Sequence, residues 1–127
     1  MAEKKSVFQF KGYKIIESSI RLDQISEPSP ELNVSFNQTV GVNEGDHKVR
    51  LEMVCTIMDK NEALKVVVKA LGFFVFEDIP SAEDKETFFR VSAPAILFPY
   101  IRAYITSLTA LSGIKPVILP TLNLTKR

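Results

Sequence analysis

Apolar and polar residues alternate through much of the first half of the chain, at the spacing expected of strands with one buried face. From Leu32 to Val42 every second residue is apolar except Gln38, and the alternation resumes from Val49 to Ile57. The residues Asn43–Asp46 between them have turn chemistry, because Gly45 can adopt a positive φ. This pattern predicts an antiparallel hairpin.

A third strand, predicted from about Leu64 to Glu77, is apolar on both faces in its second half. Its alternating face continues the pattern of the hairpin, while Leu71, Phe73 and Val75 occupy the opposite face. Since an antiparallel sheet normally leaves one face to water, we expect another element or subunit to cover this second face.

An earlier extended segment, Val7 to Leu22, brings the predicted strands to four. It ends at Ser26–Pro30, where Pro28 and Pro30 form a stiff crossover that cannot contribute to a central hydrogen-bond ladder. The first strand therefore connects to the hairpin through a rigid loop.

The pattern changes after Pro80, where Ser81 to Glu86 is predicted to be a charged connector. Apolar residues then recur at steps of three and four from Pro94 to Leu111, which is typical of a helix. Gly113 is suited to its C-cap and Pro116 prevents continuation. Because proline inside a helix costs about 3 kcal/mol, we expect the main helix to begin near Pro99; the alternative is a kinked helix opened by Pro94. The predicted fold class is α+β, a four-stranded antiparallel sheet with one main helix packed on one side.

Composition and charge exclude several classes of protein. The 127 residues fit a single domain, and 46% hydrophobic with 24% charged residues argues against general disorder. Sixteen basic against fifteen acidic residues argue against a dedicated nucleic-acid binder. The N-terminus has no signal-peptide core, and no apolar run reaches the ~20 residues of a membrane span. We therefore expect a cytoplasmic protein with no membrane insertion.

Few residues offer reactive chemistry. His47 is the only histidine and falls in a turn, while Cys55, the only cysteine, falls on the apolar face of its strand. A surface histidine and an inert core thiol are the favoured interpretations, and together they cannot make a closed zinc site. No nucleotide-binding loop is present. We expect no enzyme activity, no metal and no cofactor.

Apolar surface is instead in excess, with nine phenylalanines and no tryptophan. One helix cannot cover all of a four-stranded sheet, so we expect another subunit or a ligand to bury the surplus.

The segment from Phe88 through Leu108, in particular Leu97-Phe98-Pro99-Tyr100 with the following Arg102 and Ile105-Thr106-Ser107, resembles the SecB family of export chaperones. The loop Pro120-Thr-Leu122-Asn-Leu124 reinforces the likeness, which covers about the last third of the chain.

The resemblance implies an ATP-independent chaperone that binds unfolded preproteins in apolar grooves and passes them to SecA. It also implies a homo-oligomer, a dimer or dimer of dimers, in which the small residues Ala103, Ser107 and Ala110 let helices approach between subunits. Family members typically continue into a second helix and a SecA-binding tail and are strongly acidic. This chain is near neutral and resembles a short variant without those two elements.

The candidate polypeptide-binding residues come from the crossover, the helix opening and the apolar tail, and each would also suit an ordinary core position. They are Leu32, Phe98, Tyr100, Ile101, Ile118, Leu119, Leu122 and Leu124. The candidate oligomer-interface residues are Leu71, Phe73, Val75, Ala103, Ser107 and Ala110.

Two other readings stay open from the sequence. One is a structural or regulatory oligomer, such as a chaperone associated with a toxin–antitoxin pair, without general client binding. The other is a small-molecule-binding domain with a closed pocket between helix and sheet.

Overall fold

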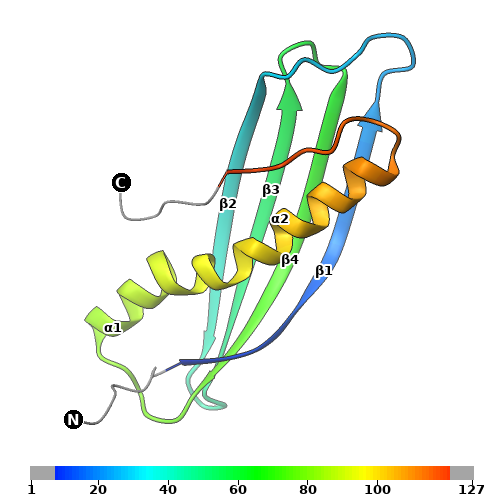
Figure 1. The fold of residues 1–127 in the computed structure, drawn as a ribbon. Helices are drawn as coiled ribbons and strands as arrows, with labels where there is room; N and C mark the ends of the chain where they lie inside the picture. The colour runs from blue at the N-terminus through cyan, green and yellow to red at the C-terminus, as the bar shows by residue number, and fades with distance from the viewer. Residues whose placement is uncertain (1–7, 121–127) are drawn as a thin grey trace, which may run out of the picture.

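The computed structural model describes residues 8–120, which form a four-stranded antiparallel sheet with a helical layer on one face (Figure 1). The strand order is β1-β4-β3-β2. The strands are β1 (Phe8–Leu22), β2 (Leu32–Asn43), β3 (Lys48–Asp59) and β4 (Leu64–Phe76). The helical elements are α1 (Ala82–Thr87), the π-helical segment η1 (Phe88–Ser92) and α2 (Ala93–Leu111), after which residues 112–120 run back over the sheet.

The predicted α+β class and the four antiparallel strands are confirmed. In β3 and β4, alternate residues are buried against α2, as their period-two pattern requires. The predicted buried face of β2 is only half realised: Leu32, Phe36 and Val40 are half-buried, whereas Val34 and Val42 are exposed. The reason is that β2 is an edge strand: α2 lies mainly over β4, β1 and β3 and reaches β2 through the edge-to-face contact of Phe98 with Phe36.

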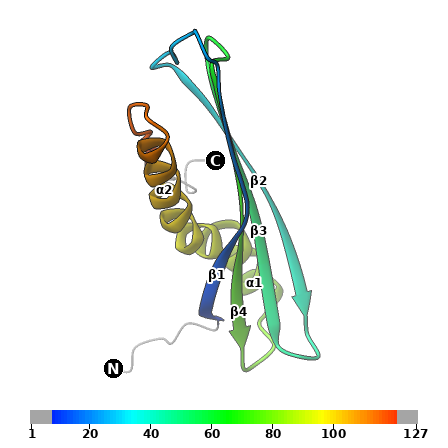
Figure 2. The same ribbon diagram turned by 90° about the vertical axis from the view of Figure 1, so that its right-hand side faces the viewer.

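The helix approaches the sheet closely at Gly72 of β4. A Cβ atom on this residue would lie 3.4 Å from Cδ2 of Leu97 and 3.3 Å from the ring of Phe74. Glycine therefore leaves room for the fully buried Leu97 side chain. Figure 2 shows the resulting two layers, in which all helices of the described residues 8–120 lie along one face of the sheet.

The core lies between these layers and is built mainly from the two central strands and α2, with contributions from β1, η1 and the returning loop. It contains Phe8, Val49, Leu51, Met53, Cys55, Ile57, Leu64, Val66, Val68, Ala70, Phe74, Phe76, Phe88, Ala93, Leu97, Phe98, Ile101, Ile105, Val117 and Leu119.

The prediction that Ser81 to Glu86 is a connector is wrong, because this segment forms α1. The Ser81 hydroxyl caps the helix by accepting a hydrogen bond from the backbone N–H of Asp84 at 3.1 Å. Glu83 and Asp84 place negative charge in the first turn, where the helix dipole favours it. The sequence carries this capping signal, with Ser81 three residues before Asp84, inside a segment whose polarity is also typical of loops.

The preferred start of the main helix near Pro99 is also wrong, because α2 begins at Ala93 with Pro94 in its first turn. Pro99 lies inside the helix and removes the hydrogen bond to the carbonyl of Ala95. Both residues are exposed, so water can reach that side of the helix.

We predict that Leu97→Ala lowers the free energy of unfolding by about 2–5 kcal/mol, because it leaves a cavity between α2 and the sheet. Leu111→Ala is the matched control on the same helix, since Leu111 is 89% exposed, and should change stability by less than about 0.5 kcal/mol. Urea denaturation of both variants measures the difference. Equal effects would contradict the packing described for α2.

Candidate polypeptide-binding surface

The crossover between β1 and β2 starts with a turn held by Asp23. Its Oδ2 accepts hydrogen bonds from the backbone N–H groups of Ser26 (2.6 Å) and Ile25 (3.0 Å). These bonds hold the pKa of Asp23 below its usual range. The segment with Pro28 and Pro30 comes directly after this turn in the sequence. Because proline fixes φ, the chain enters β2 along a defined path.

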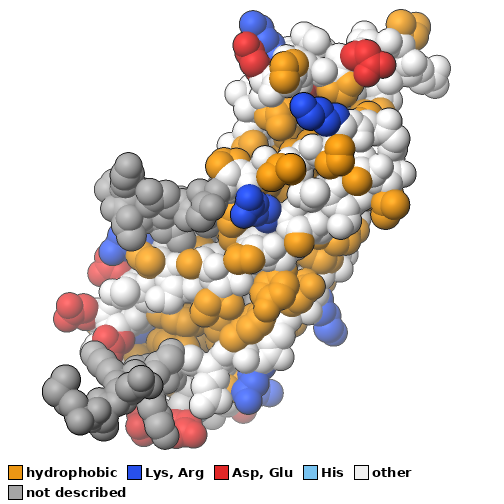
Figure 3. Space-filling model, in the orientation of Figure 1, with side chains coloured by type: hydrophobic (Ala, Val, Ile, Leu, Met, Phe, Trp, Pro, Cys, Tyr) orange, Lys and Arg blue, Asp and Glu red, His pale blue; other side chains and the backbone are white. Residues whose placement is uncertain are grey.

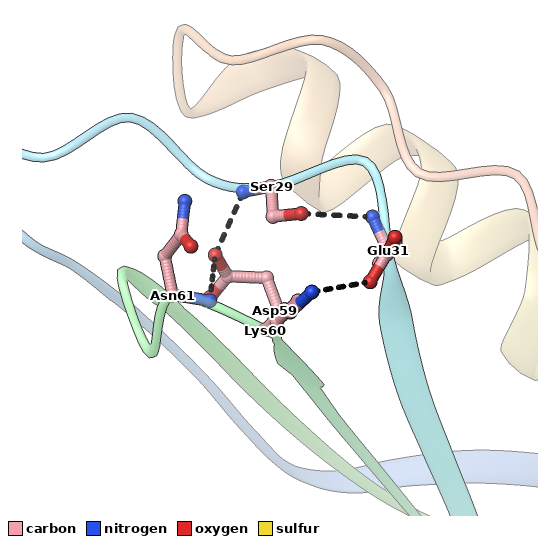
Figure 4. Close-up of polar contacts among 5 residues, drawn as sticks. All are labelled: Ser29, Glu31, Asp59, Lys60 and Asn61. Carbon is pink, nitrogen blue, oxygen red and sulfur yellow. Dashed lines mark hydrogen bonds and ion pairs between the residues drawn. The ribbon is translucent and has the colours of Figure 1, made fainter.

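Asp59, at the end of β3, ties the crossover to the β3–β4 turn (Figure 4). Its Oδ2 accepts hydrogen bonds from the backbone N–H groups of Ser29 (2.8 Å) and Asn61 (3.2 Å), and its Oδ1 accepts one from Leu64 N–H (2.8 Å). An exposed ion pair between Lys60 and Glu31 (3.4 Å) lies beside this cluster. One carboxylate thus fixes two loops at the same end of the sheet.

The side chain of Asp59 is 1% exposed, and burial alone would raise its pKa. Backbone N–H donors from Ser29, Leu64, Asn61 and Ala63 outweigh this effect, so the pKa of Asp59 is held below its usual range. The ionised form therefore stabilises the crossover.

Two threonines of α2 hold the loop that follows the helix. The hydroxyl of Thr109 accepts a hydrogen bond from Val117 N–H at 2.8 Å, and the hydroxyl of Thr106 donates one to Val117 O at 2.8 Å. Val117 and Leu119 consequently point into the core, while Ile118 between them is 69% exposed. Because side chains alternate along this extended segment, the large apolar side chain of Ile118 points outward.

A groove of about 360 Å³ lies between the crossover and this loop, and we call it the crossover groove. Its walls are apolar or proline-rich, with charged groups at Glu27 and Lys115. The lining residues are Glu27, Pro28, Ser29, Pro30, Leu32, Leu64, Ile114, Lys115, Pro116, Val117 and Ile118.

A second hollow, of about 520 Å³, follows α2 on the other side of Ile118, and we call it the helix groove. It is lined by Phe98, Pro99, Arg102, Ala103, Thr106, Ser107 and Ile118. Ile118 is therefore the ridge that both grooves share.

An exposed aromatic pair extends the apolar surface on the β1 side of α2. The rings of Tyr13 and Tyr100 stack with centroids 4.2 Å apart, and both side chains are about 40% exposed. Ile16 and Ile96 are also exposed. Figure 3 shows hydrophobic side chains gathered along the line of α2 on this face of the molecule.

The comparisons with known proteins agree with this architecture. The family model for preprotein translocase subunit SecB matches residues 14–126. The chain belongs to the SecB family. An uncharacterized protein of Methanocaldococcus jannaschii is 32% identical over 96% of this chain and 83% of its own, and protein-export protein SecB of Alcanivorax borkumensis is 27% identical over 95% and 83%.

A solved structure shares the fold of this SecB family chain. The SecB-like chaperone of Mycobacterium tuberculosis, in complex with a ChAD peptide from the HigA1 antitoxin, superposes with a TM-score of 0.78. The match covers 91% of this chain and 88% of that one at 16% identity. The likeness places the sheet and the main helix within the SecB-like fold.

The structure distributes the predicted binding residues over several places. Leu32 lines the crossover groove, Phe98 lines the helix groove while being only 4% exposed, and Ile118 lies in both grooves. Tyr100 is on the β1 side of α2, stacked on Tyr13.

Two other predicted residues, Ile101 and Leu119, lie in the core of the chain and present almost no surface. The remaining pair, Leu122 and Leu124, lies outside the described residues. The sequence analysis missed Ile114 and Lys115 as groove residues. The helix stop at Gly113 was the available signal, because it turns the chain back over the sheet.

The predicted interface residues fall on two separate surfaces of this SecB family member. Ala103, Ser107 and Ala110 are exposed on α2, and the first two also line the helix groove. The β4 residues on the face opposite α2 are half-buried: Leu71, Phe73 and Val75.

The two residues with reactive side chains, Cys55 and His47, are both packed against apolar neighbours. Burial raises the pKa of the Cys55 thiol to about 12. His47 is half-exposed in its turn, and its ring stacks on Phe76 with centroids 5.1 Å apart. Within residues 8–120, no cluster of three His, Cys, Asp or Glu side chains could hold a metal ion, and no helix is long and apolar enough to span a membrane.

We predict that Asp59→Asn loosens the crossover, because the side-chain amide keeps one acceptor oxygen and its NH₂ cannot accept the backbone N–H groups that faced the other oxygen. Amide hydrogen exchange should become faster at Ser29 or at Leu64, whichever N–H group then faces the NH₂. Because the pKa of folded Asp59 is lowered, the wild-type protection should be complete above the unfolded pKa of about 3.9 and be lost as the pH falls through the folded value. Exchange rates that are unchanged in the variant would contradict the role of Asp59.

Proposed function

We propose that this SecB family chain is an ATP-independent holding chaperone that binds non-native polypeptides in the cytoplasm, in the service of protein export. The observation that carries the proposal is the crossover groove, an apolar channel of about 360 Å³ that Asp59 and the α2 threonines hold in shape. Unfolded chains expose the apolar side chains that such a channel can bury.

Binding by this groove requires no chemical step. Each client Leu or Phe side chain that leaves water contributes about 1.5–3 kcal/mol, from which the cost of ordering the client must be subtracted. Several contacts are therefore needed, and the exposed Tyr13–Tyr100 pair offers further apolar surface beyond the groove. The outer edge of β2 offers backbone groups for strand-like hydrogen bonds.

We further propose that α2 mediates self-assembly into a dimer or a dimer of dimers. The side chains of Ala103, Ser107 and Ala110 are short and exposed, so a second helix can approach the backbone closely. Assembly through this surface would occupy the helix groove and leave the crossover groove for clients. SecA is the partner to which an export chaperone of this family would deliver them.

A second candidate function is service to a single dedicated client. The structural neighbour from Mycobacterium tuberculosis was solved with a peptide of an antitoxin. If this chain served a toxin–antitoxin pair, it would bind one partner protein and would suppress the aggregation of unrelated unfolded proteins only weakly.

We predict that Ile118→Asp reduces client holding, because it places a charge on the 69% exposed ridge of the crossover groove. Light scattering of a denatured, aggregation-prone client without ATP is the measurement. Half-suppression should need about tenfold more variant than wild type, which corresponds to about 1.4 kcal/mol.

Ile79→Asp is the matched control, since Ile79 is 63% exposed and lines neither groove. It should suppress aggregation like the wild type. Equal activity of all three proteins would exclude the crossover groove, and a well-folded wild type that never suppresses aggregation would refute the holding function.

We predict that Ala103→Arg combined with Ser107→Arg lowers the mass in solution to that of the monomer, because two long charged side chains prevent close helix approach. Multi-angle light scattering gives the mass. Ala82→Arg, at an exposed alanine of α1, should leave the mass unchanged. An oligomer that persists in the double variant would move the interface away from α2.

A further inference from the structure

The sheet face opposite α2 carries a strong excess of positive charge, although the whole chain has a formal charge of only +1. The register of the strands assigns six basic and two acidic side chains to this outer face. The basic residues are Lys14, Arg21, Lys48, Arg50, Lys65 and Lys69, and the acidic residues are Glu17 and Glu52.

Both carboxylates of the outer face pair with the same lysine. Lys69 Nζ lies 3.6 Å from Glu17 Oε2 and 3.9 Å from Glu52 Oε1. Within residues 8–120, none of the other five cations of this face is in an ion pair. Their charge is therefore available to a partner.

A hollow of about 730 Å³ lies at the end of this face near the β2–β3 turn. Phe73 and Val75 supply apolar surface, and Lys11, Lys48 and Arg50 supply positive charge. No carboxylate lines it in the described part of the chain. We call it the basic hollow.

Two glycines stand at the ends of the residue row that crosses the basic hollow. The register places Gly12, Phe73, Arg50 and Gly41 in one row across β1, β4, β3 and β2. A Cβ atom on Gly12 would meet nothing within 4 Å, and one on Gly41 would meet only the Arg50 carbonyl oxygen at 4.0 Å. The side chains of Phe73 and Arg50 thus have no side-chain neighbour at either end of their row.

We propose that the basic hollow binds an acidic polypeptide segment that also carries apolar side chains. An apolar residue of the segment packs on Phe73 and Val75, while its carboxylates pair with Arg50, Lys48 and Lys11. Arginine suits this role because its guanidinium can hold a carboxylate through two parallel hydrogen bonds. The basic hollow shares no lining residue with the crossover groove, so its occupant is independent of the holding function.

The charge and the aromatic content of this face favour an acidic peptide over a second copy of the chain or a nucleic acid. A second copy seated face to face on a two-fold axis would bring the same cations together, which is unfavourable. A nucleic acid is disfavoured because, among the described strand residues, Phe73 is the only aromatic one that faces outward here, whereas single strands need several stacking platforms. An acidic peptide satisfies both the charge and the apolar floor.

The test is fluorescence anisotropy of a labelled peptide rich in Glu and Leu, with full-length protein at low salt. The matched peptide has Gln in place of every Glu. We expect the Glu peptide to bind at least about tenfold more tightly, and the difference to shrink as salt screens the charges. Arg50→Glu together with Lys48→Glu should abolish the preference, and Lys65→Glu, on the same face but outside the hollow, should retain it.

Circular dichroism tests whether each variant is folded. If the double variant Arg50→Glu, Lys48→Glu is unfolded, the single variant Arg50→Gln is used in its place. Equal binding of the two peptides, or binding that survives the loss of Arg50, would overturn the proposal. Tighter binding of a single-stranded RNA oligonucleotide than of the Glu peptide would overturn it in favour of nucleic acid. A change of oligomer mass on Arg50→Gln, without a change in peptide binding, would overturn it in favour of a second copy. The aggregation assay with Ile118→Asp is a separate readout, so either proposal can fail alone.

Discussion

Leu97 of α2 packs over Gly72 of β4, and this contact sets the distance between the two layers of the molecule. A single helix held over the central strands buries alternate residues of β3 and β4 but leaves β2 half-covered. The apolar surface beside α2 remains because, within residues 8–120, a single helical layer covers one face of the sheet (Figure 2). Exposed grooves along α2 follow from this one-sided coverage.

Polar anchors give the uncovered region a defined shape. The buried carboxylate of Asp59 holds the crossover, and Thr109 holds the segment after α2 through Val117. Both anchors satisfy backbone N–H groups that would otherwise lose their hydrogen bonds on burial. A groove built from loops can thus persist without a client, which lowers the ordering cost of binding.

The two faces of the sheet differ in chemistry as well as in coverage. The helix side is apolar with little charge in its grooves, whereas the outer side combines half-buried Phe73 and Val75 with unpaired cations. The net charge of +1 does not reveal the positive charge of the outer sheet face, because acidic residues elsewhere in the chain offset it. Fold membership in the SecB family therefore does not decide which partners each face of this chain accepts.

The sequence by itself determined the four strands, the hairpin, the main helix and the excess of apolar surface, because period two and period 3.6 are local properties of the chain. The family motif around Phe98 and Pro99 was equally local. Only the tertiary structure decided that Ile101 and Leu119 are core while Ile118 is a ridge, since this depends on how the loop is anchored to α2. It also decided the basic hollow, because Gly12, Phe73, Arg50 and Gly41 become neighbours only when strands distant in sequence pair in one register.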